Sequence, residues 1–345
     1  MFDKAVIEKL RHELGFKDPG IFEKAVCALN LLPSLLDVYP DLIFKGGTAI
    51  LLHQYPPLRL SIDIDILLPE KAKTSLNGKL AEIAKASGFF KSVEEDVRES
   101  HIPKAHFKFF YDSHFSKREQ NILLDVFFCE SPYPKMVKKP LRGNALILKD
   151  TDAVVTIPTA EGLFGDKLTA MAPKTLGLRL TDGRDMEFVK QIIDLGGLFE
   201  LVSSVGEIKK AFENTAEQEN GFRRTHFTLD EVIEDILDVA RKYSQWMVKG
   251  GDSSFKEIGS INRGLERLRN HLVDNVDSGA LKLIFGKIAY VLKLINEPKP
   301  EKILKTADLS LAKELRFEGK FKILEGLRKM QPEAYSYWTL AVGNR

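Results

Sequence analysis

Residues 41–69 have the sequence DLIFKGGTAILLHQYPPLRLSIDIDILLP, and this stretch decides the fold. The apolar run 41–47 ends in paired glycines, which predicts a short strand that enters a tight turn. Residues 48–55 have the pattern of a helix, which the following pair of prolines should stop. Within residues 58–69, polar and apolar side chains alternate strictly from Leu58 to Ile66, which predicts a second strand.

The polar face of this second strand carries four side chains, namely Arg59, Ser61, Asp63 and Asp65. Two carboxylates on one face repel each other, and burying them without a counter-charge would be costly. A divalent cation removes that cost, and hard oxygen ligands suit Mg²⁺ or Mn²⁺. An exposed edge strand with two solvated aspartates is the alternative, and the Asp-x-Asp pattern taken alone favours it.

The segment Gly46-Gly47-Thr48 lies between the first predicted strand and the predicted helix. Glycines let the backbone approach a ligand closely, and a helix N-terminus offers N–H groups to an anion. The pattern therefore predicts a phosphate site beside a metal held by the aspartates. The simpler alternative is a strand–helix turn with Thr48 as the N-cap.

Asp125 stands alone inside the apolar run 121–130, NILLDVFFCE. A lone carboxylate is costly in such a strand unless it has a function. On a neighbouring strand, Asp125 would complete a metal cluster and could accept the proton of an attacking hydroxyl group. His101 and His106 match no metal-binding spacing, so we expect them to be solvated or core histidines.

The rest of the chain predicts an α/β (α+β) core with a small mixed sheet, residues 1–200, and an all-α C-terminal domain, residues 201–345. Strands are expected at 106–115 and 121–130, and a basic loop at 131–144. The first 38 residues should be helical with a break near Pro33. Helices should dominate after Thr159, one of them opened by the capping box Thr228–Glu231.

Composition excludes several classes of protein. The 345 residues are 44% hydrophobic and 29% charged, which is typical of a folded domain rather than a disordered chain. A net charge of +2 argues against a uniformly basic nucleic-acid binder, and two cysteines cannot form a disulfide framework. The N-terminus has no signal-peptide pattern and no apolar run is long enough to span a membrane, so we expect a cytoplasmic protein.

Residues 44–69, FKGGTAILLHQYPPLRLSIDIDILLP, resemble the GG(S/T)…D-x-D core of nucleotidyltransferases with the DNA polymerase β fold. The form KGGTA followed by R-x-S-x-D-I-D is similar to the AbiEii/AbiGii toxin family. These are the toxins of type IV toxin–antitoxin and abortive-infection systems, and they include MenT-type enzymes. Two later segments, EGLFGDKLTAMAP at 161–173 and MEFVKQIIDLGGLFE at 186–200, resemble the lysine motif and the last motif of this family.

The resemblance implies a nucleotidyltransferase that moves a nucleoside monophosphate from a nucleoside triphosphate to an acceptor. Asp63, Asp65 and Asp125 would hold Mg²⁺ or Mn²⁺, with Gly46, Gly47, Thr48, Arg59 and Ser61 around the nucleotide. Lys167 would neutralise charge on the triphosphate. Asp194 would orient that lysine or the acceptor, and Asp185 competes for the same role.

In relatives the acceptor is RNA, the end of a tRNA, and a separate antitoxin protein restrains the toxin. By analogy we expect an RNA acceptor and a cognate antitoxin for this chain. The basic run Lys135, Lys138, Lys139 and Arg142 is either a solvated loop or an RNA contact. Two alternatives stay open: a nucleotidyltransferase that modifies a small molecule or a protein, and a D-x-D glycosyltransferase.

Overall fold

The computed structural model describes residues 2–98, 102–180, 183–310 and 316–343, so His101 lies outside the described residues. The chain separates into two compact units, and each is described here by itself. The first, the sheet unit, contains Met1–Ser131, Lys135–Thr159 and Asn270–Asp274. The second, the helical unit, contains Pro132–Pro134, Ala160–Arg269 and Asn275–Arg345. The domain boundary predicted at residue 200 remains a prediction, because these two compact units do not show where independently folding domains begin and end.

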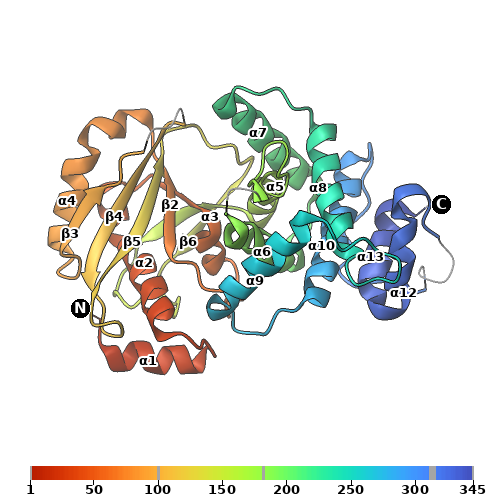
Figure 1. Ribbon diagram of the computed structural model, residues 1–345. Helices are drawn as coiled ribbons and strands as arrows, with labels where there is room; N and C mark the ends of the chain where they lie inside the picture. Colours follow the sequence, from red (N-terminus) through yellow and green to blue (C-terminus); the bar gives the residue numbers. More distant parts are fainter. Residues whose placement is uncertain (1, 99–101, 181–182, 311–315, 344–345) are drawn as a thin grey trace. The chain divides into compact units, whose positions relative to one another are not determined.

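The sheet unit is built on one seven-stranded mixed sheet in the order β3-β4-β5-β2-β1-β7-β6 (Figure 1). The pairs β2–β5 and β1–β7 are parallel, and the other four are antiparallel. The strands are β1 Ile43–Lys45, β2 Asp63–Leu67, β3 Ser92–Glu95, β4 Lys104–Asp112, β5 Glu119–Phe127, β6 Met136–Pro140 and β7 Val154–Pro158. The expected small mixed sheet is therefore confirmed.

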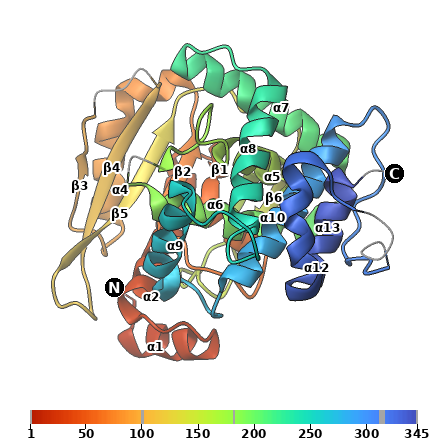
Figure 2. The ribbon, with the colours of Figure 1, turned by 45° about the vertical axis from the view of Figure 1, so that its right-hand side comes forward.

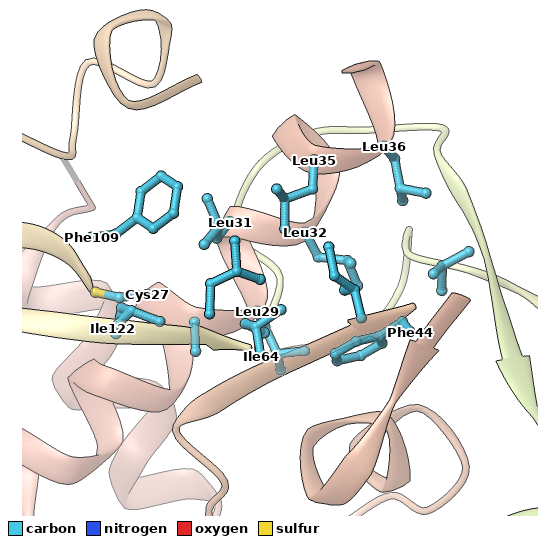
Figure 3. Close-up of a cluster of buried hydrophobic side chains, with 14 of the residues drawn as sticks. Cys27, Leu29, Leu31, Leu32, Leu35, Leu36, Phe44, Ile64, Phe109 and Ile122 are labelled. Carbon is cyan, nitrogen blue, oxygen red and sulfur yellow. The ribbon is translucent and has the colours of Figure 1, made fainter. Parts of the chain in front are cut away.

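Helix α2, Pro19–Val38, covers one face of this sheet, and the core of the sheet unit lies between them (Figure 3). Leucines of α2 meet Phe44 of β1, Ile64 of β2 and Ile122 of β5, all of which are completely buried. Because side chains alternate along a strand, the neighbours of these residues point to the opposite face. That opposite face carries Asp63, Asp65 and Asp125. The remaining helices of the unit are α1 Lys4–Glu13, α3 Gly46–Ala49, η1 Ile50–Leu52, η2 Glu70–Ser75 and α4 Leu76–Ala86.

Three local expectations were wrong. Pro33 does not break the first long helix, because buried leucines on both sides of it keep the helix packed on the sheet, which outweighs the cost of roughly 3 kcal/mol for an internal proline. The strand expected over 58–69 begins only at Asp63, since Arg59 pairs instead with Leu272. The basic loop expected at 131–144 contains strand β6, which pairs with β7 at the sheet edge.

The helical unit contains only helices and connecting segments among its described residues, as expected for the C-terminal region. Thr228 caps helix α8 and forms the predicted capping box with Glu231. Helix α5 packs on α7, and α10 packs on α13 (Figure 2). The elements are α5 Ala160–Ala170, α6 Asp185–Leu201, α7 Val205–Arg223, α8 Leu229–Ser244, α9 Lys256–Leu268, η4 Arg269–His271 at its border, α10 Ser278–Asn296, η5 Gly319–Gly326, α12 Leu327–Met330 and α13 Pro332–Val342. Among the described residues, no helix combines the length and the apolar character required to cross a lipid bilayer.

Candidate active site

A row of polar side chains crosses four neighbouring strands of the sheet. Lys45 of β1 is in register with Asp65 of β2, and Asp65 is in register with Asp125 of the parallel strand β5. Asp125 is in turn in register with His106 of β4. Neighbouring strands lie about 4.8 Å apart, so Asp65 and Asp125 are adjacent on one face, with Asp63 two residues before Asp65. The three predicted aspartates therefore come together, and all three are half-buried.

The tight turn before α3 lies directly against this row. Gly46 has a φ of +77°, a left-handed conformation that favours glycine, and a Cβ there would overlap Oδ2 of Asp65. Gly47 has no such φ, but a Cβ there would lie 2.5 Å from Nη2 of Arg59 and 3.1 Å from Oγ of Ser61. Gly46 is thus required by both its φ and its close approach to Asp65, whereas a side chain at Gly47 would have to displace Arg59.

Thr48, Arg59 and Ser61 are buried around the turn. The helix begins at Gly46 with Lys45 as its N-cap residue, so the N-cap role considered for Thr48 is wrong. The hydroxyl of Thr48 is hydrogen-bonded to the Ser61 hydroxyl at 2.8 Å and to the backbone carbonyl of Asp63. Through its side chain, Thr48 therefore fixes the start of strand β2 relative to the glycine turn.

The sequence analysis missed one residue that contacts an aspartate, His106, and one whose pKa is influenced by an aspartate, Lys24. His106 is buried, and its Nδ1 lies 2.6 Å from Oδ1 of Asp125. Lys24 of α2 is near enough to Asp63 to feel its charge: burial lowers the pKa of Lys24, and Asp63 raises it in part. The alternation of 104–112 gave a signal for His106, because it places this histidine on the polar face with Lys108. No pattern links Lys24 to Asp63, which is 39 residues away.

Lys167 and Asp194, the two residues implied by the later motifs, form an ion pair inside the helical unit. Nζ of Lys167 on α5 lies 2.7 Å from Oδ2 of Asp194 on α6 and 2.9 Å from Oε1 of Gln191. Both charged side chains are almost completely buried, at 6% and 4% exposed. Asp185, the competing residue, instead accepts a hydrogen bond from Nε of Arg263. Of the two aspartates, Asp194 is therefore the partner of Lys167.

The donor set of the sheet unit can be tested against the expected metal. Three carboxylates are hard oxygen ligands of the kind that Mg²⁺ and Mn²⁺ prefer. Within the described ranges, however, no group of three or more His, Cys, Asp or Glu side chains is arranged to hold a metal ion by itself. Mg²⁺ usually keeps waters and shares the phosphates of a substrate. The donor types therefore suit Mg²⁺ or Mn²⁺, but the described side chains alone would leave such an ion with ligands to be supplied by other groups.

The structure thus places a glycine turn against the carboxylate of Asp65 on a mixed sheet, as the sequence resemblance predicts. The sequence model described as "Nucleotidyl transferase AbiEii toxin, Type IV TA system" matches residues 34–258. That match covers more than half of the chain, and the chain belongs to this family of toxin nucleotidyltransferases. Membership implies a nucleoside triphosphate as substrate and a cognate antitoxin as partner. It also decides against the glycosyltransferase alternative. No curated protein matches the chain.

Several solved structures are similar to the chain at low sequence identity. MenT4, a nucleotidyltransferase toxin from Mycobacterium tuberculosis, is 11% identical with a TM-score of 0.46, over 86% of this chain and 100% of that one. JHP933 from Helicobacter pylori is 17% identical with a TM-score of 0.45, over 78% and 89% of the two chains. An antigenic nucleotidyltransferase-like protein from Paracoccidioides brasiliensis is 15% identical with a TM-score of 0.37, over 59% and 91%.

Proposed function

We propose that this toxin transfers a nucleoside monophosphate from a nucleoside triphosphate to RNA, with the end of a tRNA as the acceptor, in a reaction that depends on Mg²⁺ or Mn²⁺. The observation that carries the proposal is the contact between the Gly46–Gly47 turn and Asp65, which is in register with Asp125. A triphosphate at the turn would lie beside carboxylates that cannot approach it without a cation between them.

Asp63, Asp65 and Asp125 would hold the metal. When bound, it would neutralise charge on the phosphates and activate the attacking hydroxyl group. The chain's own groups have separate tasks. The Gly46–Gly47 backbone approaches the phosphates, and Arg59 is held beside Gly47, where its guanidinium adds positive charge. Asp125 is the candidate to accept the proton of the acceptor hydroxyl.

Lys167 is assigned to the triphosphate by the family motif. In the structure its ammonium group is held by Asp194 and Gln191, which keep the charge of this buried side chain paired. We therefore assign to Asp194 the first of the two roles that the motif implies, that of orienting Lys167, because the two side chains form an ion pair.

An RNA acceptor requires a basic surface, and the helical unit contains a candidate. A cavity of about 1100 Å³ is lined by twelve residues, of which Lys174, Arg179, Lys256 and Arg263 are cations and Glu257 is the one acidic side chain. Arg179 and Lys256 are exposed, whereas Lys174 and Arg263 contact Asp238 and Asp185. The predicted run around β6 is a weaker candidate, because Arg142 contacts Asp150 and Asp152.

The test is to incubate the protein with total tRNA, Mg²⁺ and each α-³²P-labelled nucleoside triphosphate in turn. We expect at least one nucleotide to label RNA, and no label with Asp65→Asn or with excess chelator. If a small molecule or a protein is labelled and no RNA is, the protein is instead a nucleotidyltransferase that modifies that kind of acceptor. Equal labelling with and without divalent metal would reject the metal site.

The acceptor surface is tested by salt dependence. Each phosphate contact on a single strand adds about 0.7 to the slope of log K against log salt. The pair Arg179→Gln and Lys256→Gln should lower this slope for tRNA binding, and the matched pair Lys138→Gln and Lys139→Gln should not. The opposite result would place the RNA contact at strand β6.

A further inference from the structure

His106 is unusual among the side chains around the aspartates, because it is a buried polar group that the proposed reaction does not use. The residue is only 4% exposed, whereas the side chain of Asp125 remains 30% exposed. Its Nδ1 lies 2.6 Å from Oδ1 of Asp125. A carboxylate can only accept a hydrogen bond, so Nδ1 is the donor.

The register places Asp125 between two different neighbours. Asp65 lies on one side of it, in β2, and His106 lies on the other side, in β4. A carboxylate that rotates about its Cβ–Cγ bond presents neither oxygen in a fixed direction. The hydrogen bond from His106 holds Oδ1 on the β4 side and fixes this rotation, so Oδ2 is the oxygen left to face a cation shared with Asp65.

We propose that His106 is a positioning residue that holds Asp125 in the orientation needed to share a divalent cation with Asp65. The inference rests on the proposed function, since it assigns the task of His106 at the same site. Hydrogen bonds to metal-ligating carboxylates commonly act in this way, and their loss reduces metal affinity by roughly 10- to 100-fold.

A role in packing alone does not account for this histidine. Its other ring nitrogen, Nε2, is buried and has no hydrogen-bond partner among the described residues. A buried polar atom without a partner destabilises the fold, so an apolar side chain would be the better choice for stability. A residue that weakens the fold and contacts a candidate metal ligand is the pattern expected of a functional position.

Three substitutions separate the hydrogen bond from the bulk of the side chain. In His106→Asn the amide nitrogen replaces Nδ1 and can still donate to Asp125. In His106→Gln the amide nitrogen replaces Nε2 instead, so it cannot make the same bond without rotating. In His106→Leu there is no donor.

The readout is Mn²⁺ binding, measured by electron paramagnetic resonance in the presence of a nucleoside triphosphate analogue with a non-hydrolysable α–β bond. We expect His106→Asn to bind Mn²⁺ nearly as tightly as the wild type, and His106→Gln and His106→Leu to bind about 10-fold more weakly. The melting temperature of His106→Leu should equal or exceed that of the wild type. In turnover, the loss should appear in kcat rather than in the KM for RNA.

Other outcomes overturn the inference. Equal Mn²⁺ affinity in all four proteins, or equal weakening in the Asn and Leu variants, would show that the Nδ1 hydrogen bond does not orient Asp125. If Mn²⁺ affinity falls only in those His106 variants whose melting temperature also falls, His106 has a structural role and not a positioning one. If the wild type itself binds no Mn²⁺ with the nucleotide analogue, the proposed metal-dependent function fails and the inference fails with it.

Discussion

Gly46 and Gly47 are adjacent, yet a side chain is excluded at each position for a different reason. At Gly46 both the positive φ and the carboxylate of Asp65 stand in the way. At Gly47 the obstacle is the guanidinium group of Arg59, which is the end of a long side chain and can move. A methyl group at Gly46 therefore strains the backbone, whereas one at Gly47 displaces Arg59.

This difference gives a prediction about Gly47. We expect Gly47→Ala to reduce nucleotide transfer strongly while changing stability by less than about 1 kcal/mol, because the main obstacle is the end of the Arg59 side chain and the Ser61 hydroxyl must shift by only a few tenths of an ångström. If the effect acts through Arg59, the double variant Gly47→Ala/Arg59→Ala should be no less active than Arg59→Ala alone. Additive losses in this double-mutant cycle would mean that the methyl group itself blocks the triphosphate.

A second prediction concerns the buried pair of Lys167 and Asp194. Removing one partner of a buried ion pair is strongly destabilising, so Lys167→Met or Asp194→Leu should each lower the free energy of unfolding by about 3–5 kcal/mol. The double variant should regain most of this stability and still lack activity. Urea denaturation of the three proteins checks the prediction. A stable and inactive Lys167→Met single variant would show that the charge of Asp194 is balanced by other groups.

Among single residues, the sequence revealed side chains whose burial costs free energy. It missed side chains whose role depends on contacts with distant parts of the chain. Asp125 stood out because a carboxylate is rare in an apolar strand. His106 did not, because alternation places it only on the polar face of its strand, and its contact with Asp125 depends on the register between β4 and β5. Arg59 was predicted from the alternation of its strand, but its place beside Gly47 comes from the chain path between the turn and β2.

At the scale of elements, long periodic segments were predicted well and short or edge elements were not. The capping box at Thr228 and the alternation around Asp63 are local signals, and both are present in the structure. Strand β6 was missed because its lysines and proline resemble a loop, and only pairing with β7 makes it a strand. Helix α2 passes through Pro33 because its packing on the sheet outweighs a local signal.

Helix α8 gives a prediction about pH. Burial would raise the pKa of Asp238, but hydrogen bonds from Lys174, Lys242 and Arg241 outweigh it and lower the pKa to about 2. A lowered pKa in the folded state adds stability that is present above the ordinary value of 3.8 and is lost as the pH falls towards 2.

We therefore expect the stability difference between the wild type and Asp238→Asn to be constant near neutral pH and to shrink as the pH falls from about 4 to about 2. Urea unfolding at a series of pH values measures this difference. A difference that stays constant over the whole range would show that the ion contacts of Asp238 add no stability.

At the scale of the whole molecule, the chain contributes segments to its two units out of sequence order. Asn270–Asp274 follows helix α9 of the helical unit but belongs to the sheet unit. There the backbone N–H of Leu60 donates to the carbonyl of His271, and the N–H of Val273 donates to the carbonyl of Leu58. This short pairing holds the residues on both sides of Arg59. No local signal could predict it, because the partners are more than 200 residues apart.

A prediction tests whether this pairing matters for the site. Val273→Pro removes the N–H that contacts Leu58, whereas Val273→Ala keeps it and loses only part of the side chain. We expect faster hydrogen exchange at the Leu60 amide and lower nucleotide transfer in the proline variant, with the alanine variant close to the wild type. If both variants exchange and react alike, the downstream segment does not control the position of Arg59.

The same pairing sets an order of events during synthesis on the ribosome. The segment around Arg59 emerges early, but its backbone partners, His271 and Val273, emerge only after more than 270 of the 345 residues have been made. Until then, the arginine beside the glycine turn lacks the strand that holds it. A nascent or prematurely terminated chain that lacks His271 and Val273 therefore also lacks the backbone hydrogen bonds on both sides of Arg59.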